Sequence, residues 1–81
     1  MAYILVIDDD NDFRTVLKLM LTRLGHSPTL ASRGEEGLAL AISNKYDLIL
    51  LDLMLPDVDG FEVARRLRGA NRTRNLPILI L

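Results

Sequence analysis

Aspartates dominate the side chains of this sequence that could do chemistry. Eight of the eleven acidic residues are aspartates, and seven of these fall in two short clusters, within residues 8–12 and 52–59. Carboxylate oxygens are the ligands that hard cations such as Mg²⁺ prefer. A carboxylate next to a phosphate that a metal orients can also act as the nucleophile and form an acyl phosphate. The chain has no cysteine, which excludes disulfides and thiolate metal sites.

Three of these aspartates lie at the ends of two apolar runs. The run Tyr3–Ile7 ends at Asp8 and Asp9, and the run 47–53, with four consecutive apolar residues at 48–51, contains Asp52 near its end. Uninterrupted apolar runs of this length are typical of strands buried on both faces, as in parallel sheets. Ligands bind beyond the carboxyl ends of such strands. If the two strands are neighbours, the three carboxylates meet at one edge of the sheet.

Helical patterns separate the strands. A helix is expected over about 11–24, where an apolar stripe precedes Gly25 as a C-terminal cap and comprises Phe13, Val16, Leu17, Met20 and Leu24. Ser32 and Glu35 have the spacing of a capping box, which predicts a second helix with an apolar stripe at Leu38, Ala41 and Ile42. A third helix is expected at 61–68, with Val63, Ala64 and Leu67 on its buried side.

The remaining segments complete an alternating order of strands and helices. Short strands are expected at 28–31 and 77–81, while Pro56 and Gly60 bracket a loop because neither suits the interior of a helix or strand. His26, the only histidine, is expected in a surface turn. The order predicts an α/β fold with a parallel sheet covered on both faces.

The clustered carboxylates allow two interpretations. Two like charges about 4 Å apart repel by roughly 4 kcal/mol at an effective dielectric constant of 20, so that a pKa rises or a cation binds. Acidic residues after a strand are also common helix caps, a role open to Asp10 or Asn11. Spacing alone leaves the metal site and the caps both open. An EF-hand is excluded, because counting from Asp8 puts Leu19 where that loop needs a bidentate glutamate.

Charge and length restrict the possible partners. The net charge of -1 argues against a global attraction to nucleic acid or to anionic membranes. Five of the eight arginines lie between Arg65 and Arg74 and are expected at a solvated helix end and loop. No apolar stretch approaches the roughly 18 residues of a membrane span. The 81 residues therefore predict one small, soluble, cytoplasmic domain with no membrane or direct nucleic-acid partner.

Two motifs together resemble the receiver domain of two-component response regulators. They are Ile4-Leu5-Val6-Ile7-Asp8-Asp9-Asp10 and Asp52-Leu53-Met54-Leu55-Pro56-Asp57-Val58-Asp59-Gly60. The resemblance extends over the whole chain in order and spacing. It implies a flavodoxin-like (CheY-like) three-layer fold with strand order 2-1-3-4, and a signalling domain rather than a turnover enzyme.

The resemblance also implies roles for individual residues. Asp52 would accept a phosphoryl group from a phosphohistidine on a sensor histidine kinase. Mg²⁺ would be held by Asp9 directly, by Asp8 mainly through water, by Asp52, and by the backbone carbonyl of Met54.

In the loop after the phosphoacceptor, Pro56 and Gly60 would set the shape. The stretch Asp57-Val58-Asp59-Gly60 is superficially similar to the motif of haloacid-dehalogenase-type phosphatases. Those aspartates directly follow an apolar strand, whereas Leu55-Pro56 precedes them here, which argues against that enzyme class.

The resemblance ends within the receiver pattern. The family's Ser or Thr after the fourth strand would follow Leu81, and its fifth strand, with a phosphate-binding lysine, and last two helices lie beyond it. Residues 1–81 are thus expected to form a partial receiver domain that is impaired in signalling. Strand 77–81 would be an exposed edge that favours a homo-oligomer. The alternative is a non-signalling fragment that acts only as a self-association module.

Overall fold

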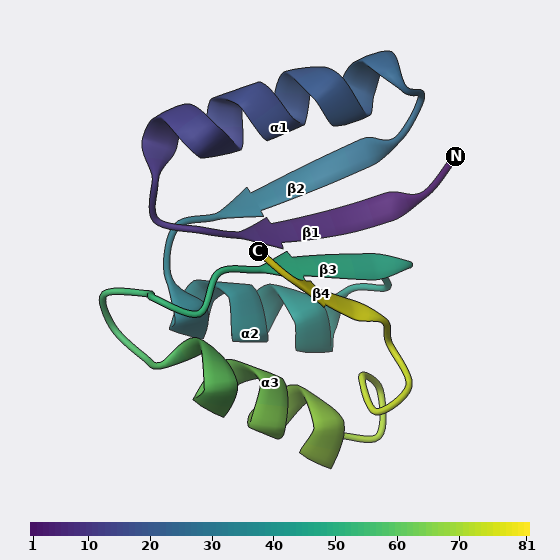
Figure 1. The fold of residues 1–81 in the computed structure, drawn as a ribbon. Helices are drawn as coiled ribbons and strands as arrows, with labels where there is room; N and C mark the ends of the chain where they lie inside the picture. The colour runs from purple at the N-terminus through teal and green to yellow at the C-terminus, as the bar shows by residue number, and fades with distance from the viewer.

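Strands and helices alternate along residues 1–81, all of which the computed structural model describes (Figure 1). In chain order they are β1 (Tyr3–Ile7), α1 (Asn11–Arg23), β2 (Ser27–Ala31), α2 (Gly34–Ser43), β3 (Leu48–Leu51), α3 (Gly60–Gly69) and β4 (Ile78–Ile80). The four strands form one sheet in the order β2-β1-β3-β4, and every pairing is parallel. The predicted α/β class and strand order are confirmed.

The two central strands are apolar on both faces because both faces are covered. Leu5 and Ile7 of β1 point into a core that they share with β3, α2 and α3, whereas Ile4 and Val6 belong to a smaller core beneath α1. Helices α2 and α3 cover one side of the sheet and α1 covers the other (Figure 1). This arrangement explains why β1 and β3 read as continuous apolar runs rather than as alternating ones.

The apolar stripe predicted for α1 is mostly exposed, which corrects that expectation. Val16, Met20 and Leu24 are 51%, 53% and 69% exposed, and no residue of α1 is fully buried. The helix instead packs on β2 and β1 through the half-buried Leu17 and Leu21. Since α1 is the only helix on its side of the sheet, no second helix covers the rest of its apolar surface.

The inward face of α2 also differs from the predicted stripe. Leu38 and Ala41 are buried as expected, but Ile42 is 49% exposed. Gly34 and Gly37 complete the buried face at i, i+3, i+4 and i+7. A methyl group on Gly37 would lie 2.4 Å from Cδ1 of Ile7, so that glycine lets α2 approach β1 closely. A pattern based on apolar side chains cannot identify a face made partly of glycine.

The end of α3 accounts for the cluster of arginines. Val63 and Leu67 are buried and Ala64 is half-buried against the core, as predicted. Arg68 donates from one guanidinium nitrogen to three carbonyl oxygens of the following loop, at residues 73, 74 and 76. Arg65 and Arg66 pair with Glu62 on the surface. Arg68 therefore organises the loop after α3, whereas Arg65 and Arg66 form ion pairs on the surface of the helix.

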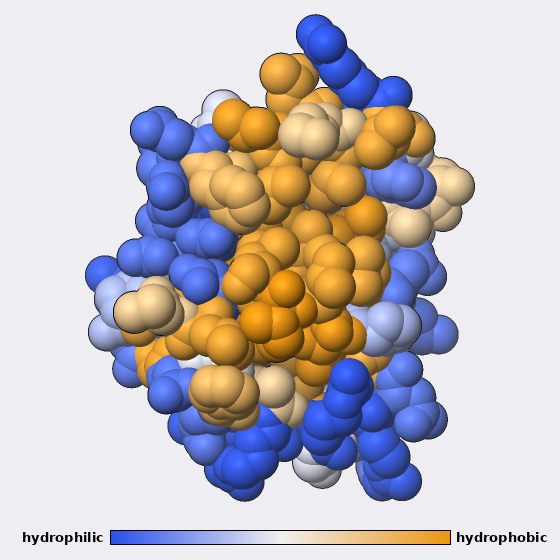
Figure 2. All heavy atoms as spheres, in the orientation of Figure 1, coloured by the Kyte–Doolittle hydropathy of each residue, from blue (hydrophilic) through white to orange (hydrophobic).

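The edge strand β4 lies within a large apolar surface. Leu79, Ile80 and Leu81 are 55%, 44% and 44% exposed. Figure 2 shows apolar side chains over the centre of the face on which β4 and the C terminus lie in Figure 1. None of the three helices has both the length and the apolar composition needed to cross a bilayer.

Candidate functional site

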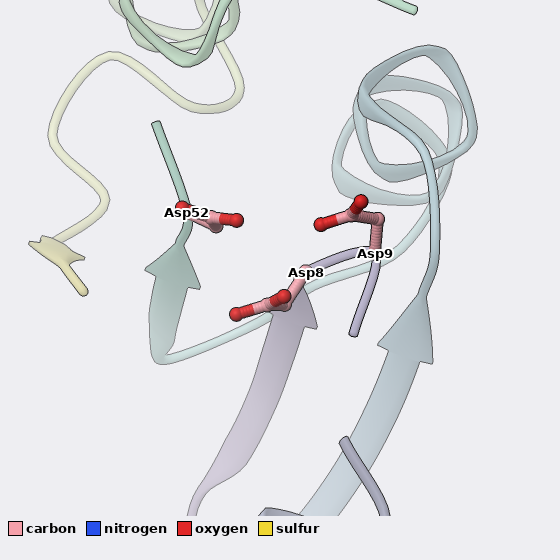
Figure 3. Close-up of side chains that lie close together, drawn as sticks. All are labelled: Asp8, Asp9 and Asp52. Atoms are coloured by element: carbon pink, nitrogen blue, oxygen red, sulfur yellow. The ribbon is translucent and has the colours of Figure 1, made fainter. Parts of the chain in front are cut away.

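Three carboxylates meet at the carboxyl edge of the sheet. Asp8 and Asp9 directly follow β1, and Asp52 directly follows β3, its paired neighbour. Each residue offers a carboxylate oxygen, and these oxygens lie within 4.8 Å of one another. The side chains point toward the space between the two strand ends (Figure 3). Asp8 is buried, Asp52 is half-buried and Asp9 is exposed, so the group opens to solvent on one side.

The environment of Asp8 disfavours a third negative charge. Burial raises the pKa of the Asp8 carboxyl, and the negative charges of Asp52, Asp9 and Asp10 raise it further. A hydrogen bond that the Asp10 N–H donates to Oδ1 of Asp8, 2.9 Å long, acts in the opposite direction. A divalent cation between the carboxylates would relieve this repulsion. The donors are all oxygen, which suits Mg²⁺ in kind.

The two interpretations of the first acidic cluster apply to different residues. The Asp10 carboxylate accepts hydrogen bonds from the N–H groups of Asp12 and Phe13, at 3.0 and 3.1 Å, and is the N-cap of α1. Asp8 and Asp9 are not needed for this cap. They remain available, with Asp52, as ligands.

Arg14 holds the loop between β1 and α1, a role that sequence reasoning missed. Its guanidinium donates to the backbone carbonyl of Asp8 at 2.8 Å and to Oδ1 of Asn11 at 3.2 Å. The Asp8 N–H donates to the carbonyl of Ala31 on β2 at 3.1 Å. An arginine at the end of the first turn of the helix is visible in the sequence, but nothing local marks a backbone carbonyl as its partner.

The backbone on either side of Asp52 is fixed by contacts to other strands and to its own loop. The Asp52 N–H donates to the carbonyl of Ile7 on β1 at 2.9 Å. The Met54 N–H donates to Oδ1 of Asp52 at 3.1 Å, and the Met54 side chain is 83% exposed. An open cleft of about 480 Å³ lies beside the carboxylates, lined by Asp9 and by residues 53–59.

Gly60 is the first residue of α3 and lies against the backbone at the end of β3. A methyl group on Gly60 would lie 2.4 Å from Cα of Leu53 and 2.6 Å from the carbonyl oxygen of Asp52. The Gly60 N–H donates to the Leu53 carbonyl at 3.0 Å. Only a residue without a side chain fits here. Pro56, the other residue expected to shape this loop, lies exposed within it and lines the cleft.

The second acidic cluster is divided between two helices. The predicted capping box of Ser32 and Glu35 is wrong, because α2 begins at Gly34 and its N-cap, Arg33, makes no capping bond from its side chain. The Asp57 carboxylate supplies the cap instead, accepting from the N–H groups of Gly34 at 2.8 Å and Glu35 at 3.0 Å.

These caps lie outside the group of three carboxylates. The hydrogen bond from the Glu35 N–H is the main reason that the pKa of Asp57 is lowered. Asp59 caps α3, since its carboxylate accepts from the Phe61 N–H at 2.7 Å. Asp57 and Asp59 line the cleft, but the group of carboxylates close enough together to share a metal ion consists of Asp8, Asp9 and Asp52.

Known proteins share this fold and this order of motifs. The sequence model of the response regulator receiver domain matches residues 4–81. The chain belongs to this family of receiver domains. Receiver domains of response regulators are signalling domains rather than turnover enzymes.

Curated and solved relatives agree with that assignment. This receiver chain is 52% identical, over all of its 81 residues, to the transcriptional regulatory protein AfsQ1 of Streptomyces coelicolor, of which it covers 35%. It superposes with a TM-score of 0.94 on the N-terminal domain of a response regulator receiver protein from Methanoculleus marisnigri, with 38% identity over 99% of this chain and 65% of that one.

A further solved relative contains a metal. The receiver domain of the sensor histidine kinase PA1611 from Pseudomonas aeruginosa, solved with a magnesium ion coordinated in its active-site cleft, gives a TM-score of 0.94 at 34% identity. The superposition covers 98% of this chain and 65% of that one. The chain thus spans about a third of the length of the curated relative and about two thirds of the solved domains.

Proposed function

We propose that this receiver domain accepts a phosphoryl group on the carboxylate of Asp52 in a reaction that depends on Mg²⁺. The observation behind the proposal is the convergence of three carboxylates from two paired strands, with their oxygens within 4.8 Å. The phosphoryl donor is a phosphohistidine on a sensor histidine kinase, in the cytoplasm. Residues 1–81 act as part of a receiver domain, and Asp52 is modified stoichiometrically, so the domain assists its own phosphorylation and does not turn over as an enzyme.

The metal site is proposed to consist of Asp9, Asp52 and the backbone carbonyl of Met54, with Asp8 acting mainly through water. Three features support it: the purely oxygen donor set, the raised pKa of Asp8, and the magnesium ion in the cleft of the Pseudomonas relative. When bound, Mg²⁺ would neutralise carboxylate charge and orient the phosphoryl oxygens.

In the transfer step, a carboxylate oxygen of Asp52 attacks phosphorus. A P–O bond forms as the P–N bond of the phosphohistidine breaks, and the electron pair of that bond stays on the imidazole nitrogen. The hydrogen bond from the Met54 N–H to Oδ1 orients the carboxylate for this attack. Gly60 and Pro56 keep the following loop in place, so that the cleft beside Asp52 stays open to a donor.

Binding of beryllofluoride, a phosphoryl mimic, tests the proposal. Fluorine NMR should show a bound signal that requires Mg²⁺ and that is absent in Asp52→Asn. Asp12→Asn is the matched control, because it removes the same charge from an exposed position in the first turn of α1. A bound signal that persists in Asp52→Asn, or that forms without Mg²⁺, contradicts the proposal.

A second candidate function, self-association, is favoured by the exposed edge strand. Leu79 is 55% exposed on β4, and its strand has a neighbour on one side only. An unprotected apolar edge of this kind can pair with another chain. In this alternative the chain forms a homo-oligomer through residues 77–81 and does not signal. Sedimentation should then depend on concentration and become monomeric in Leu79→Lys, whereas a monomer at all concentrations rejects this candidate.

A further inference from the structure

Asp57 is an exposed carboxylate whose partners lie far away in the sequence. Its two oxygens accept from the N–H groups of Gly34 and Glu35, which are 23 and 22 residues away. These are the first two amides of α2, and they have no partner within their own helix. Since the N-cap Arg33 makes no capping bond from its side chain, Asp57 is the side chain that caps this helix.

Asp57 belongs to the loop 53–59, and this loop packs tightly on Gly34, the first residue of α2. A methyl group on Gly34 would lie 2.1 Å from Cγ1 of Val58 and 3.3 Å from Cδ1 of Leu55. The two hydrogen bonds of Asp57 are the only ones that join loop 53–59 to α2. The carboxylate of Asp57 therefore makes all the hydrogen bonds between this loop and α2, and Leu55 and Val58 add apolar contacts.

This loop also contains the carbonyl of Met54, three residues before Asp57. Its other hydrogen bonds stay within residues 52–63: the Met54 N–H donates to Asp52, the Gly60 N–H donates to Leu53, and the N–H groups of Phe61 and Val63 donate to Asp59. These bonds tie the loop to the end of β3 and to the first turn of α3, and none of them joins it to α2. The position of the loop against α2 consequently depends on Asp57 and on the packing of Leu55 and Val58.

We propose that Asp57 is a positioning residue for the metal site, which holds in place the loop that carries the Met54 carbonyl. This inference rests on the proposed function, since it takes Met54 as a ligand. Partners that orient the ligands of a metal typically change its affinity by about 10- to 100-fold when they are removed. Asp57 acts on Met54 through three residues of chain, so the effect is expected at the lower end, about tenfold.

The test is the affinity for Mg²⁺ alone, by isothermal titration calorimetry, in a series of variants. Asp57→Ala removes both acceptors, whereas Asp57→Asn removes the same charge but keeps one acceptor oxygen. Glu62→Gln is a control that removes an equal charge from the surface of α3. We expect Asp57→Ala to bind Mg²⁺ about tenfold more weakly than the wild type, Asp57→Asn to fall between them, and Glu62→Gln to match the wild type.

Amide hydrogen exchange without metal provides an independent readout. The amides of Gly34 and Glu35 should exchange faster in Asp57→Ala than in the wild type. If they do, but both Asp57 variants bind Mg²⁺ as Glu62→Gln does, the cap serves α2 alone and the positioning role is wrong. Should the alanine variant fail to fold, Asp57→Asn must still bind more weakly than Glu62→Gln. A wild type that does not bind Mg²⁺ would instead overturn the proposed function, and this inference with it.

Discussion

Replacing Gly60 by alanine should destabilise the domain at the point where α3 meets the end of β3. The new methyl group would lie 2.4 Å from Cα of Leu53 and 2.6 Å from the carbonyl oxygen of Asp52. Ordinary van der Waals contacts of a Cβ atom begin at 3.4 Å. Both neighbours are backbone atoms, which cannot rotate away as the end of a flexible side chain can. The helix or the end of β3 must therefore move by almost 1 Å.

Two opposing effects set the change in the free energy of unfolding that Gly60→Ala should cause. Overpacking of this kind costs about 1–3 kcal/mol in free energy of unfolding. Alanine also lowers the conformational entropy of the unfolded chain, which raises the free energy of unfolding by about 0.4–1 kcal/mol. At Gly69, the other end of α3, an added methyl group would meet no atom within 4 Å, and this glycine does not have a positive φ. Gly69→Ala should therefore show only the second effect, and the two variants should differ by about 1–3 kcal/mol.

Urea unfolding followed by circular dichroism measures this difference. Thermal unfolding should agree, since each kcal/mol shifts the midpoint by about 4–8 °C in a domain of this size. Gly60→Ala is expected to be less stable than the wild type, and Gly69→Ala at least as stable. If the two alanine variants unfold at the same urea concentration, the close approach at Gly60 has no energetic consequence and the reasoning fails.

Four further substitutions test other parts of the structure, each by urea unfolding. Leu67→Ala should cost about 2–5 kcal/mol, because Leu67 is fully buried, whereas Leu19→Ala at an exposed site of α1 should change stability by less than about 0.5 kcal/mol. Asp10→Ala should cost about 1 kcal/mol through loss of the α1 cap, and an unchanged stability would show that the cap is not needed. Hydrogen bonds from Arg65 and Arg66 lower the pKa of Glu62 from 4.5 to about 2, so its stabilising effect is present above pH 4.5 and is lost as the pH falls toward about 2. The stability difference between wild type and Glu62→Gln should disappear over that range, and a difference that persists at pH 2 would contradict this assignment.

Local patterns were sufficient to predict the elements that position the carboxylates. The apolar runs of β1 and β3 are continuous because both strands are covered on both faces, and a parallel sheet then brings Asp8, Asp9 and Asp52 to one edge. This part of the site follows from two short segments and one geometric rule.

The features that sequence reasoning missed depend on partners far away in the chain. The cap of α2 comes from Asp57 rather than from Ser32. The amide of Gly34 donates to this carboxylate, which lies 23 residues away in the sequence, and the side chain of the local N-cap residue makes no capping bond. The stripe of α1 remains exposed at Met20 because burial requires a neighbouring helix as well as an apolar side chain. The loop contact of Gly34 is equally invisible in sequence, since glycine gives no apolar signal.

The most direct test of the central claim is the intact mass of the protein after incubation with acetyl phosphate. With Mg²⁺ present, the wild type should gain the mass of one phosphoryl group, and the gain should be lost when EDTA removes the metal. Asp52→Asn should show no gain, while Asp12→Asn should behave as the wild type. A phosphoryl group found on Asp52→Asn, or a wild type that stays unmodified while it binds Mg²⁺, would contradict the role proposed for Asp52.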